Sequence, residues 1–165
     1  MKSTPSSPAA LPTRSCKARS SPHVPIVSIL ARITTAGGLA APDNYRYRNT
    51  GDGTFNRISF GTKSLTNGDS WNVAAADFNN DGWIDLFVPQ GGTAIPQKSQ
   101  NSLLYTNNQD GTFTLLTNSV VFTNKANGVA CAWGDYDNDG LLDLFVSNFY
   151  GQNNFLYHNS GDGTF

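Results

Sequence analysis

The chain has 165 residues, 11 Lys and Arg, 12 acidic residues and a formal net charge of −1. This length suits one domain of ordinary size, and the near-neutral charge excludes a general electrostatic pull toward nucleic acid or anionic lipid. Every acidic residue is Asp, which favours turns and loops over helix interiors. With 16 Gly in addition, the composition predicts β-structure with tight turns.

Residues 1–43 are predicted to be a leader that precedes the folded part. Ser, Pro and Ala with scattered basic residues make up most of 1–23, a composition typical of a disordered or processed segment. The apolar stretch 24–41 ends in small residues, as a secretory signal does, but Pro25 and Arg32 interrupt it. A signal peptide and a basic nucleic-acid arm are therefore left as alternatives, and no stretch is apolar enough to span a bilayer.

From residue 44 onward a repeat runs along the chain. The heptapeptides "NTGDGTF", "NNQDGTF" and "NSGDGTF" each begin two residues after a Tyr, and the glycines of their D-G-T-F segments are 58 and 52 residues apart. An acidic stretch that leads into "DLFV" also occurs twice, again 58 residues apart. Repeats of this length indicate propellers or arrays of stacked units. The repeated aromatic residues are predicted to pack between such units; they are Tyr47, Tyr105, Tyr157, Phe55, Phe113 and Phe165.

The repeated unit is predicted to contain four short β-strands. In the last copy these are 128–134, 141–149 and 153–159, followed by a turn at "NSGDG" and a fourth strand that starts at "TF". The preceding copy has matching segments near 71–76, 84–89, 101–106 and 112–117. Residues 44–60 form an incomplete copy with only the third and fourth strands. No segment from residue 44 onward shows the sustained periodicity of a helix.

The predicted fold class is therefore all-β, with β-propeller blades of four antiparallel strands. The chain holds about two full blades (70–117 and 128–165) and a partial one (44–60). Since propellers usually close with roughly four to eight blades, we expect a fragment of a larger propeller or a unit that assembles. A β-sandwich and a stacked solenoid are the alternatives; a sandwich does not require near-identical turns at matching positions.

Two nine-residue stretches, "DFNNDGWID" (77–85) and "DYDNDGLLD" (135–143), crowd carboxylates whose like charges repel each other. A divalent cation among them would offset this repulsion, and the central Gly lets the oxygens converge. Ca²⁺ takes roughly six to eight oxygen ligands from carboxylates, amides, backbone carbonyls and water. The predicted ligands are the side chains of Asp77, Asn79, Asp81 and Asp85 with the carbonyl of Trp83, and the side chains of Asp135, Asp137, Asp139 and Asp143 with the carbonyl of Leu141.

Other interpretations of these stretches are weaker. An EF-hand requires a bidentate Glu at position 12, where this chain has Val88 and Val146, and Mg²⁺ prefers a stricter octahedron with retained waters. Plain turn formation is the remaining alternative, but the same pattern twice before the same apolar strand favours a cation site. Because Asn79 is neutral, we predict weaker binding at the first stretch. The "GDGTF" and "QDGTF" segments carry one acid each and are interpreted as hairpin turns.

The pattern "DYDNDGLLDLFV…NNFLYHNSGDGTF" resembles the FG-GAP repeat, also called the VCBS repeat, of integrin α-subunit propellers and many secreted bacterial proteins. The resemblance covers about 44–165. It implies a calcium-stabilised β-propeller, usually extracellular, with Ca²⁺ held by the Asp and Asn residues named above. The namesake Phe-Gly and Gly-Ala-Pro elements are degenerate, since Trp133 and Gly134 stand where Phe-Gly is expected.

The expected function is a calcium-binding recognition or adhesion module, secreted or on the cell surface. Its partner is a protein or a glycan, together with further blades of a longer chain or a second copy. The alternatives are a lectin-like propeller that uses Trp71, Trp83 or Tyr150, and an accessory propeller of a larger secreted enzyme. No catalytic activity, nucleic-acid partner or cofactor besides Ca²⁺ is expected. His158 is interpreted as a surface residue beside a turn, and Cys131 as a buried free thiol.

Overall fold

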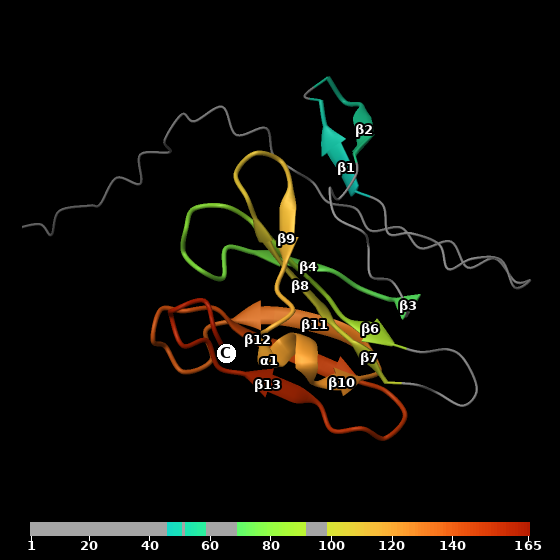
Figure 1. Cartoon of the computed structure of the whole chain (residues 1–165), viewed down its shortest axis with the longest axis vertical. Coiled ribbons are helices and arrows are strands. Elements are labelled where there is room, and N and C mark those ends of the chain that lie inside the picture. The colour runs from blue at the N-terminus through green and yellow to red at the C-terminus, as the bar shows by residue number, and fades with distance from the viewer. Residues whose placement is uncertain (1–45, 51, 59–68, 92–98) are drawn as a thin grey trace, which may run out of the picture.

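The computed structural model of the chain describes residues 46–50, 52–58, 69–91 and 99–165. The predicted leader, residues 1–43, and the signal-like stretch within it lie outside these residues. Within them, nearly all regular structure is β-strand in antiparallel sheets (Figure 1). The all-β fold class is therefore confirmed.

The first large sheet is a four-stranded antiparallel meander. Its strands are β4 (Ala74–Ala76), β5 (Asp85–Val88), β8 (Leu103–Asn107) and β9 (Phe113–Leu115), in the spatial order β4-β5-β8-β9. Spatial order follows chain order, as expected for a blade. The acidic stretch 77–85 joins β4 to β5 and ends in the first residue of β5, and a tight turn joins β8 to β9.

The second large sheet repeats this arrangement with three strands. They are β11 (Gly128–Gly134), β12 (Asp143–Asn148) and β13 (Phe155–Tyr157), in the order β11-β12-β13. The register is the same as in the first sheet, because Leu144 pairs with Tyr157 as Leu86 pairs with Tyr105. The predicted fourth strand is not formed within the described residues, and Phe165 stands where β9 begins in the first sheet.

The remaining elements are short. β1 (Arg46–Asn49) pairs with β2 (Phe55–Ile58), β3 (Asp69–Ser70) with β6 (Gln90–Gly91), and β7 (Gln100–Asn101) with β10 (Lys125–Ala126). The helix α1 (Val120–Thr123) is not expected from the sequence. A single turn is too short to show helical periodicity, and the Ser119 hydroxyl, which accepts the Val121 N–H at 3.3 Å, caps it locally.

The main core lies between the two large sheets. Phe87 and Leu104 of the first sheet meet Leu144, Val146 and Tyr157 of the second, and all five are buried. Phe78 and Val121 complete this cluster from the acidic loop and from α1. Burying such a side chain stabilises the fold by about 1.5–3 kcal/mol. The two sheets are therefore stacked and share one core, as neighbouring propeller blades do.

The repeated aromatic residues occupy different environments. Tyr157 and Phe165 lie in or against the core between the sheets, in line with the prediction. Tyr105 and Phe113 belong to a second buried cluster, on the opposite face of the first sheet. Phe55 departs from the prediction, because its side chain is 45% exposed. Its hairpin, β1–β2, pairs with no further strand within the described residues, so no sheet covers it there.

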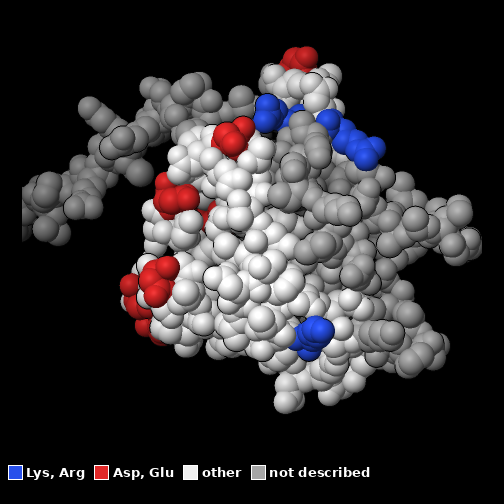
Figure 2. Space-filling view, in the orientation of Figure 1, with Lys and Arg blue, Asp and Glu red and all other residues white. Residues whose placement is uncertain are grey.

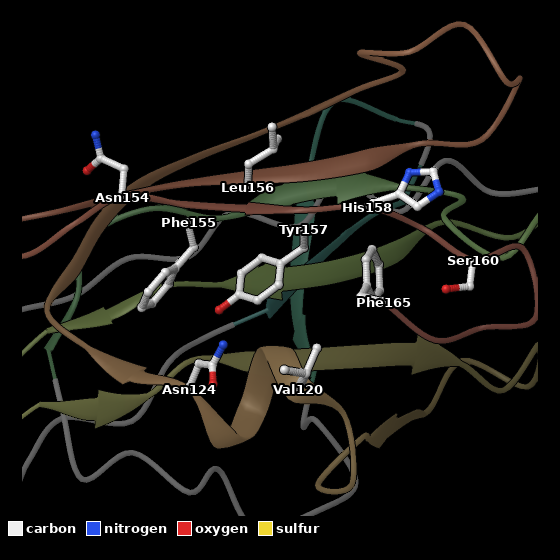
Figure 3. A pocket seen from close by; sticks show the side chains of 9 residues that line it. All are labelled: Val120, Asn124, Asn154, Phe155, Leu156, Tyr157, His158, Ser160 and Phe165. Atoms are coloured by element: carbon white, nitrogen blue, oxygen red, sulfur yellow. The ribbon is translucent and has the colours of Figure 1, made fainter.

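A hollow of about 510 Å³ follows the free edge of β13, between that strand and α1 (Figure 3). Val120 and Asn124 line one side of it, and Phe155 and Tyr157 line the other. In the first sheet, β9 covers the corresponding edge of β8. We therefore interpret the hollow as the place of a fourth strand and not as a ligand pocket.

Candidate metal centre

The two acidic stretches form two loops, called here the first acidic loop (77–85) and the second acidic loop (135–143). Both loops turn through two residues with positive φ: Asn80 (57°) and Gly82 (88°) in the first, and Asn138 (64°) and Gly140 (88°) in the second. Glycine adopts this conformation without strain and Asn tolerates it. The shared spacing of Asp, Asn and Gly therefore folds the same way twice.

Side chains inside each loop hold it in shape. In the second loop, Asp135 accepts hydrogen bonds from the N–H groups of Asp139 (3.1 Å) and Gly140 (3.0 Å), and Asp139 accepts one from the N–H of Leu141 (2.8 Å). The first loop repeats these bonds: Asp77 accepts from Asp81 (3.0 Å) and Gly82 (2.8 Å), and Asp81 accepts from Trp83 (2.8 Å). Turn formation alone accounts for such bonds, so they do not by themselves indicate a cation.

The last carboxylate of each loop is the one that turn formation does not explain. Asp85 and Asp143 are 0% and 1% exposed. Asp85 Oδ1 accepts the Asn107 N–H at 2.8 Å, but its Oδ2 is buried without a hydrogen-bond partner. Burial, together with the nearby Asp81 carboxylate, raises the pKa of Asp85 to about 7. A buried carboxylate oxygen without a donor is costly unless positive charge reaches it, and this donor set of hard oxygens fits Ca²⁺.

Two buried asparagines, neither of them predicted as a site residue from the sequence, hold these last carboxylates. The Asn159 N–H donates to Asp143 Oδ1 at 2.8 Å, and its side-chain amide donates to the carbonyls of Leu142 (3.0 Å) and Phe78 (2.8 Å). Asn107 makes the equivalent bonds to Asp85 and to the Ile84 carbonyl (3.0 Å). The available signal was the Asn that opens each "N-x-x-D-G-T-F" heptapeptide, which sequence reasoning interprets only as part of a hairpin turn.

The carboxylates of the second acidic loop converge in two overlapping groups. Oxygen atoms of Asp135, Asp137 and Asp139 lie within 4.8 Å of one another. Asp143 belongs to a second group, with Asp137 and His158. One carboxylate oxygen of each Asp and a ring nitrogen of His158 also lie within 4.8 Å of one another. Asp137 links the two groups.

The two carbonyls predicted as ligands belong to Trp83 and Leu141, which the structure places in the acidic loops. The N–H of each donates to the fifth-position carboxylate of its own loop. Coordination by their carbonyl oxygens stays a prediction.

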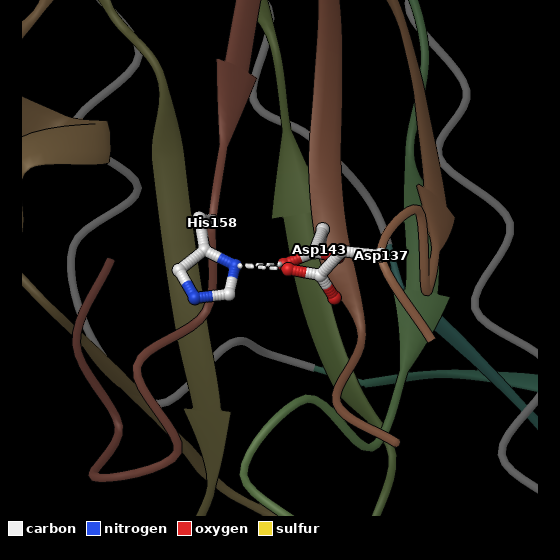
Figure 4. Close-up of side chains that lie close together, drawn as sticks. All are labelled: Asp137, Asp143 and His158. Carbon is white, nitrogen blue, oxygen red and sulfur yellow. Dashed lines mark ion pairs between the residues drawn. The ribbon is translucent and has the colours of Figure 1, made fainter. Parts of the chain in front are cut away.

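The contact of His158 with the second acidic loop is not predicted from the sequence. Its side chain is 48% exposed, in keeping with a surface position, but its ring reaches the second acidic loop (Figure 4). The Nδ1 atom lies 3.3 Å from Asp137 Oδ2 and 3.3 Å from Asp143 Oδ1. The Tyr136 ring meets the imidazole edge to face, with the centroids 6.0 Å apart. The paired strands β12 and β13 make this contact between residues far apart in sequence.

Acidic side chains gather along one side of the molecule, where the loops that follow β4 and β11 lie (Figures 1 and 2). The Lys and Arg side chains visible on the same face lie away from these loops (Figure 2). The negative potential of the loops is thus not neutralised locally on that face, and it attracts cations.

The other residues singled out from the sequence differ in exposure, and of the three aromatic residues only Trp83 belongs to an acidic loop. Trp71 and Tyr150 are exposed, as a lectin-like role would require, whereas Trp83 is half-buried. Cys131 packs against the core between the sheets, and burial raises the pKa of its thiol to about 12. In the described part of the chain, no helix has the length and apolar character needed to cross a membrane.

Comparison with protein families matches residues 33–88 and 94–146, roughly two thirds of the chain, to the FG-GAP-like repeat. In its described residues, each matched segment contains the last two strands of one unit and then the first strand, the acidic loop and the "DLFV" strand of the next. The repeat of the sequence is therefore offset from the sheets of the fold. No curated protein and no solved structure matches the chain.

Proposed function

The chain belongs to the FG-GAP-like repeat family, and from this premise we propose that its two acidic loops bind Ca²⁺ and that the ions stabilise an extracellular recognition module. Bound Ca²⁺ would supply the positive charge that the crowded carboxylates lack. The buried Oδ2 of Asp85 carries this proposal, because among the buried side-chain oxygens of the two described loops it is the one without a hydrogen-bond partner. The second loop offers the same scaffold with Asp137 in place of Asn79.

The acidic residues of each loop have different structural roles. In the second loop, Asp135 and Asp139 accept backbone N–H groups and so fix the turn. Asp143 starts β12 and is held by the N–H groups of Asn159 (2.8 Å) and Tyr136 (3.1 Å). A cation that joins these groups would tie the loop to the first residue of a core strand. The ion would therefore act on the stability of the sheet and not on a chemical reaction.

Calcium titration tests this proposal. We expect Ca²⁺ to raise the free energy of unfolding of the chelator-treated protein, by about 2.7 kcal/mol per site when its concentration is 100 times the dissociation constant. Asp139→Ala should abolish the contribution of the second loop. The matched control is Asp162→Ala, which removes an exposed Asp from a hairpin turn outside both loops. Thermal melting and calorimetry with and without chelator measure the effect, and an unchanged melting temperature in Ca²⁺ would contradict the proposal.

The proposal of calcium binding extends to the cellular location of the protein and to the kind of partner that it binds. Extracellular modules bind Ca²⁺ with dissociation constants of about 10⁻⁴–10⁻³ M, so open loops of this kind suit a secreted or cell-surface protein. Exposed aromatic side chains, with the rings of Phe149 and Tyr150 in contact at a centroid distance of 4.4 Å and tilted by 57°, offer a surface for a protein or a glycan. Matrix-protein and glycan arrays, run with Ca²⁺ and with chelator, distinguish an adhesion role from the lectin-like alternative.

One face of the second sheet is exposed, and no strand of the described residues covers it. Phe145 and Leu156 are 42% and 55% exposed, whereas the residues at the same register positions of the first sheet, Phe87 and Leu104, are fully buried. In the first sheet the second sheet covers this face. We propose that a second copy of the chain covers it in the second sheet, through a self-complementary contact.

Sedimentation velocity across a range of concentrations tests this contact. We expect a dimer fraction that grows with concentration and that Phe145→Asp lowers strongly, because the variant places a charge in an apolar contact. Thr117→Asp is the control, since it adds the same charge at an exposed position away from the sheet face. A chain that remains monomeric up to its highest soluble concentration would rule out the second copy as the occupant.

A further inference from the structure

Two carboxylates of the second acidic loop meet a histidine from a distant part of the sequence. Asp137 lies in the loop, Asp143 opens β12, and His158 follows β13. His158 Nδ1 is 3.3 Å from Asp137 Oδ2 and 3.3 Å from Asp143 Oδ1 (Figure 4). All three potential ligand atoms lie within 4.8 Å of one another. One nitrogen donor thus joins two carboxylate oxygens at one point.

These separations fit a shared ion better than a direct ion pair. Charge-assisted N–H···O bonds are about 2.7–2.9 Å long, and both contacts of Nδ1 are longer than that. Two ligand atoms bound to one tetrahedral Zn²⁺ at about 2.0–2.2 Å are about 3.3–3.5 Å apart. The observed spacing therefore matches an edge of such a tetrahedron, while the fourth position stays open to water or to another loop oxygen.

The fold holds the three ligands in place. Asp143 is 1% exposed, and the N–H groups of Asn159 and Tyr136 bind its two oxygens. The side chain of Asn159 is itself fixed to the Leu142 carbonyl. The Tyr136 ring packs edge to face on the imidazole of His158. Supporting contacts of this kind orient the ligands of a metal and raise its affinity.

The first acidic loop provides an internal comparison. Thr106 takes the place of His158 in the first sheet, since each directly follows the Tyr that pairs with the central strand. Asn79 takes the place of Asp137, since each is the third residue of its acidic loop. The first loop therefore offers oxygen donors without this nitrogen. Ca²⁺ selects oxygen ligands, whereas imidazole suits Zn²⁺ and related ions.

We propose that Asp137, Asp143 and His158 form a site for a zinc-class divalent ion, so that the second acidic loop accepts an ion that the first does not. This inference deepens the proposed function, since it uses two carboxylates of a loop already proposed to bind Ca²⁺. Zn²⁺ and Ca²⁺ would compete there, because both require the oxygens of Asp137 and Asp143. The two loops of one chain would thus differ in the metal ions that they bind.

Metal titration of the stripped full chain tests the inference. We expect calorimetry to show one Zn²⁺ site whose affinity falls at least about tenfold in His158→Thr, the residue that the first loop carries. The Ca²⁺ titration of this variant should remain that of the parent. The control Thr106→Val should alter neither titration. Co²⁺ serves as a spectroscopic probe: d–d bands of a tetrahedral ion without thiolate charge transfer exclude Cys16 and Cys131 as the ligands.

The outcomes separate this inference from the calcium proposal. Zn²⁺ binding that His158→Thr leaves unchanged would overturn the zinc site, and normal Ca²⁺ stabilisation in the same sample would leave the calcium proposal standing. Zn²⁺ binding that depends on His158 in a chain that does not bind Ca²⁺ would support the inference and refute the other. Nitrogen NMR of the imidazole gives a direct readout, since Zn²⁺ should shift the His158 Nδ1 resonance, identified by its loss in the variant.

Discussion

Asn159→Ala is expected to lower the free energy of unfolding by about 2–4 kcal/mol, a large effect for one polar side chain at an acidic loop. Asn159 is fully buried, and its amide joins the two large sheets through the Phe78 carbonyl (2.8 Å) as well as binding the Leu142 carbonyl (3.0 Å). Its Oδ1 accepts the Gly161 N–H at 3.0 Å. Truncation leaves these groups without partners, in places where water does not replace the lost bonds freely.

The matched variant is Asn107→Ala, at the same position of the first sheet. Asn107 is also buried and binds the Ile84 carbonyl and the Gln109 N–H, so both variants lose the local pair of bonds. Of the two asparagines, only Asn159 bonds to Phe78, in the acidic loop of the neighbouring unit. We therefore expect Asn159→Ala to cost about 1–2 kcal/mol more than Asn107→Ala. Urea unfolding measures the difference, and equal costs for the two variants would show that the bond between the sheets contributes nothing.

Leu144→Ala should cost about 2–5 kcal/mol, because it leaves a cavity in the core between the sheets. Leu144 has no exposed surface and lies against Phe87 and Leu104 of the other sheet in one cluster. The core here is one layer of side chains from two sheets, so the surrounding residues have little room to collapse around the gap. Chemical unfolding at low protein concentration, with unchanged slope against denaturant, is the measurement.

Leu156→Ala is the control for this second experiment. It deletes the same side chain from the adjacent strand of the same sheet, but Leu156 is 55% exposed on the other face. A surface substitution of this kind should cost less than about 1 kcal/mol in the monomer. Should the two leucines prove equally costly, the assignment of the buried and the open face of the second sheet would be wrong.

The local features of this protein could be predicted from its sequence. The two acidic loops and the tight turns depend on contacts within a few residues, so spacing was enough to predict them. Asp77 to Asp81 and Asp135 to Asp139 form the same bonds because the same Asp, Asn and Gly pattern produces the same turn. The "DLFV" strands likewise adopt one register in both sheets.

The surroundings of these local features depend on how the sheets pack, which the sequence pattern does not show. "DLFV" occurs twice, yet Phe87 is fully buried and Phe145 is 42% exposed, because a neighbouring sheet covers one copy and, within the described residues, no sheet covers the other. In the same way, only strand pairing brings His158 to Asp137, and only sheet stacking brings Asn159 to Phe78. Burial and ligand sets are properties of neighbours that are distant in sequence, so identical local sequence leaves them open.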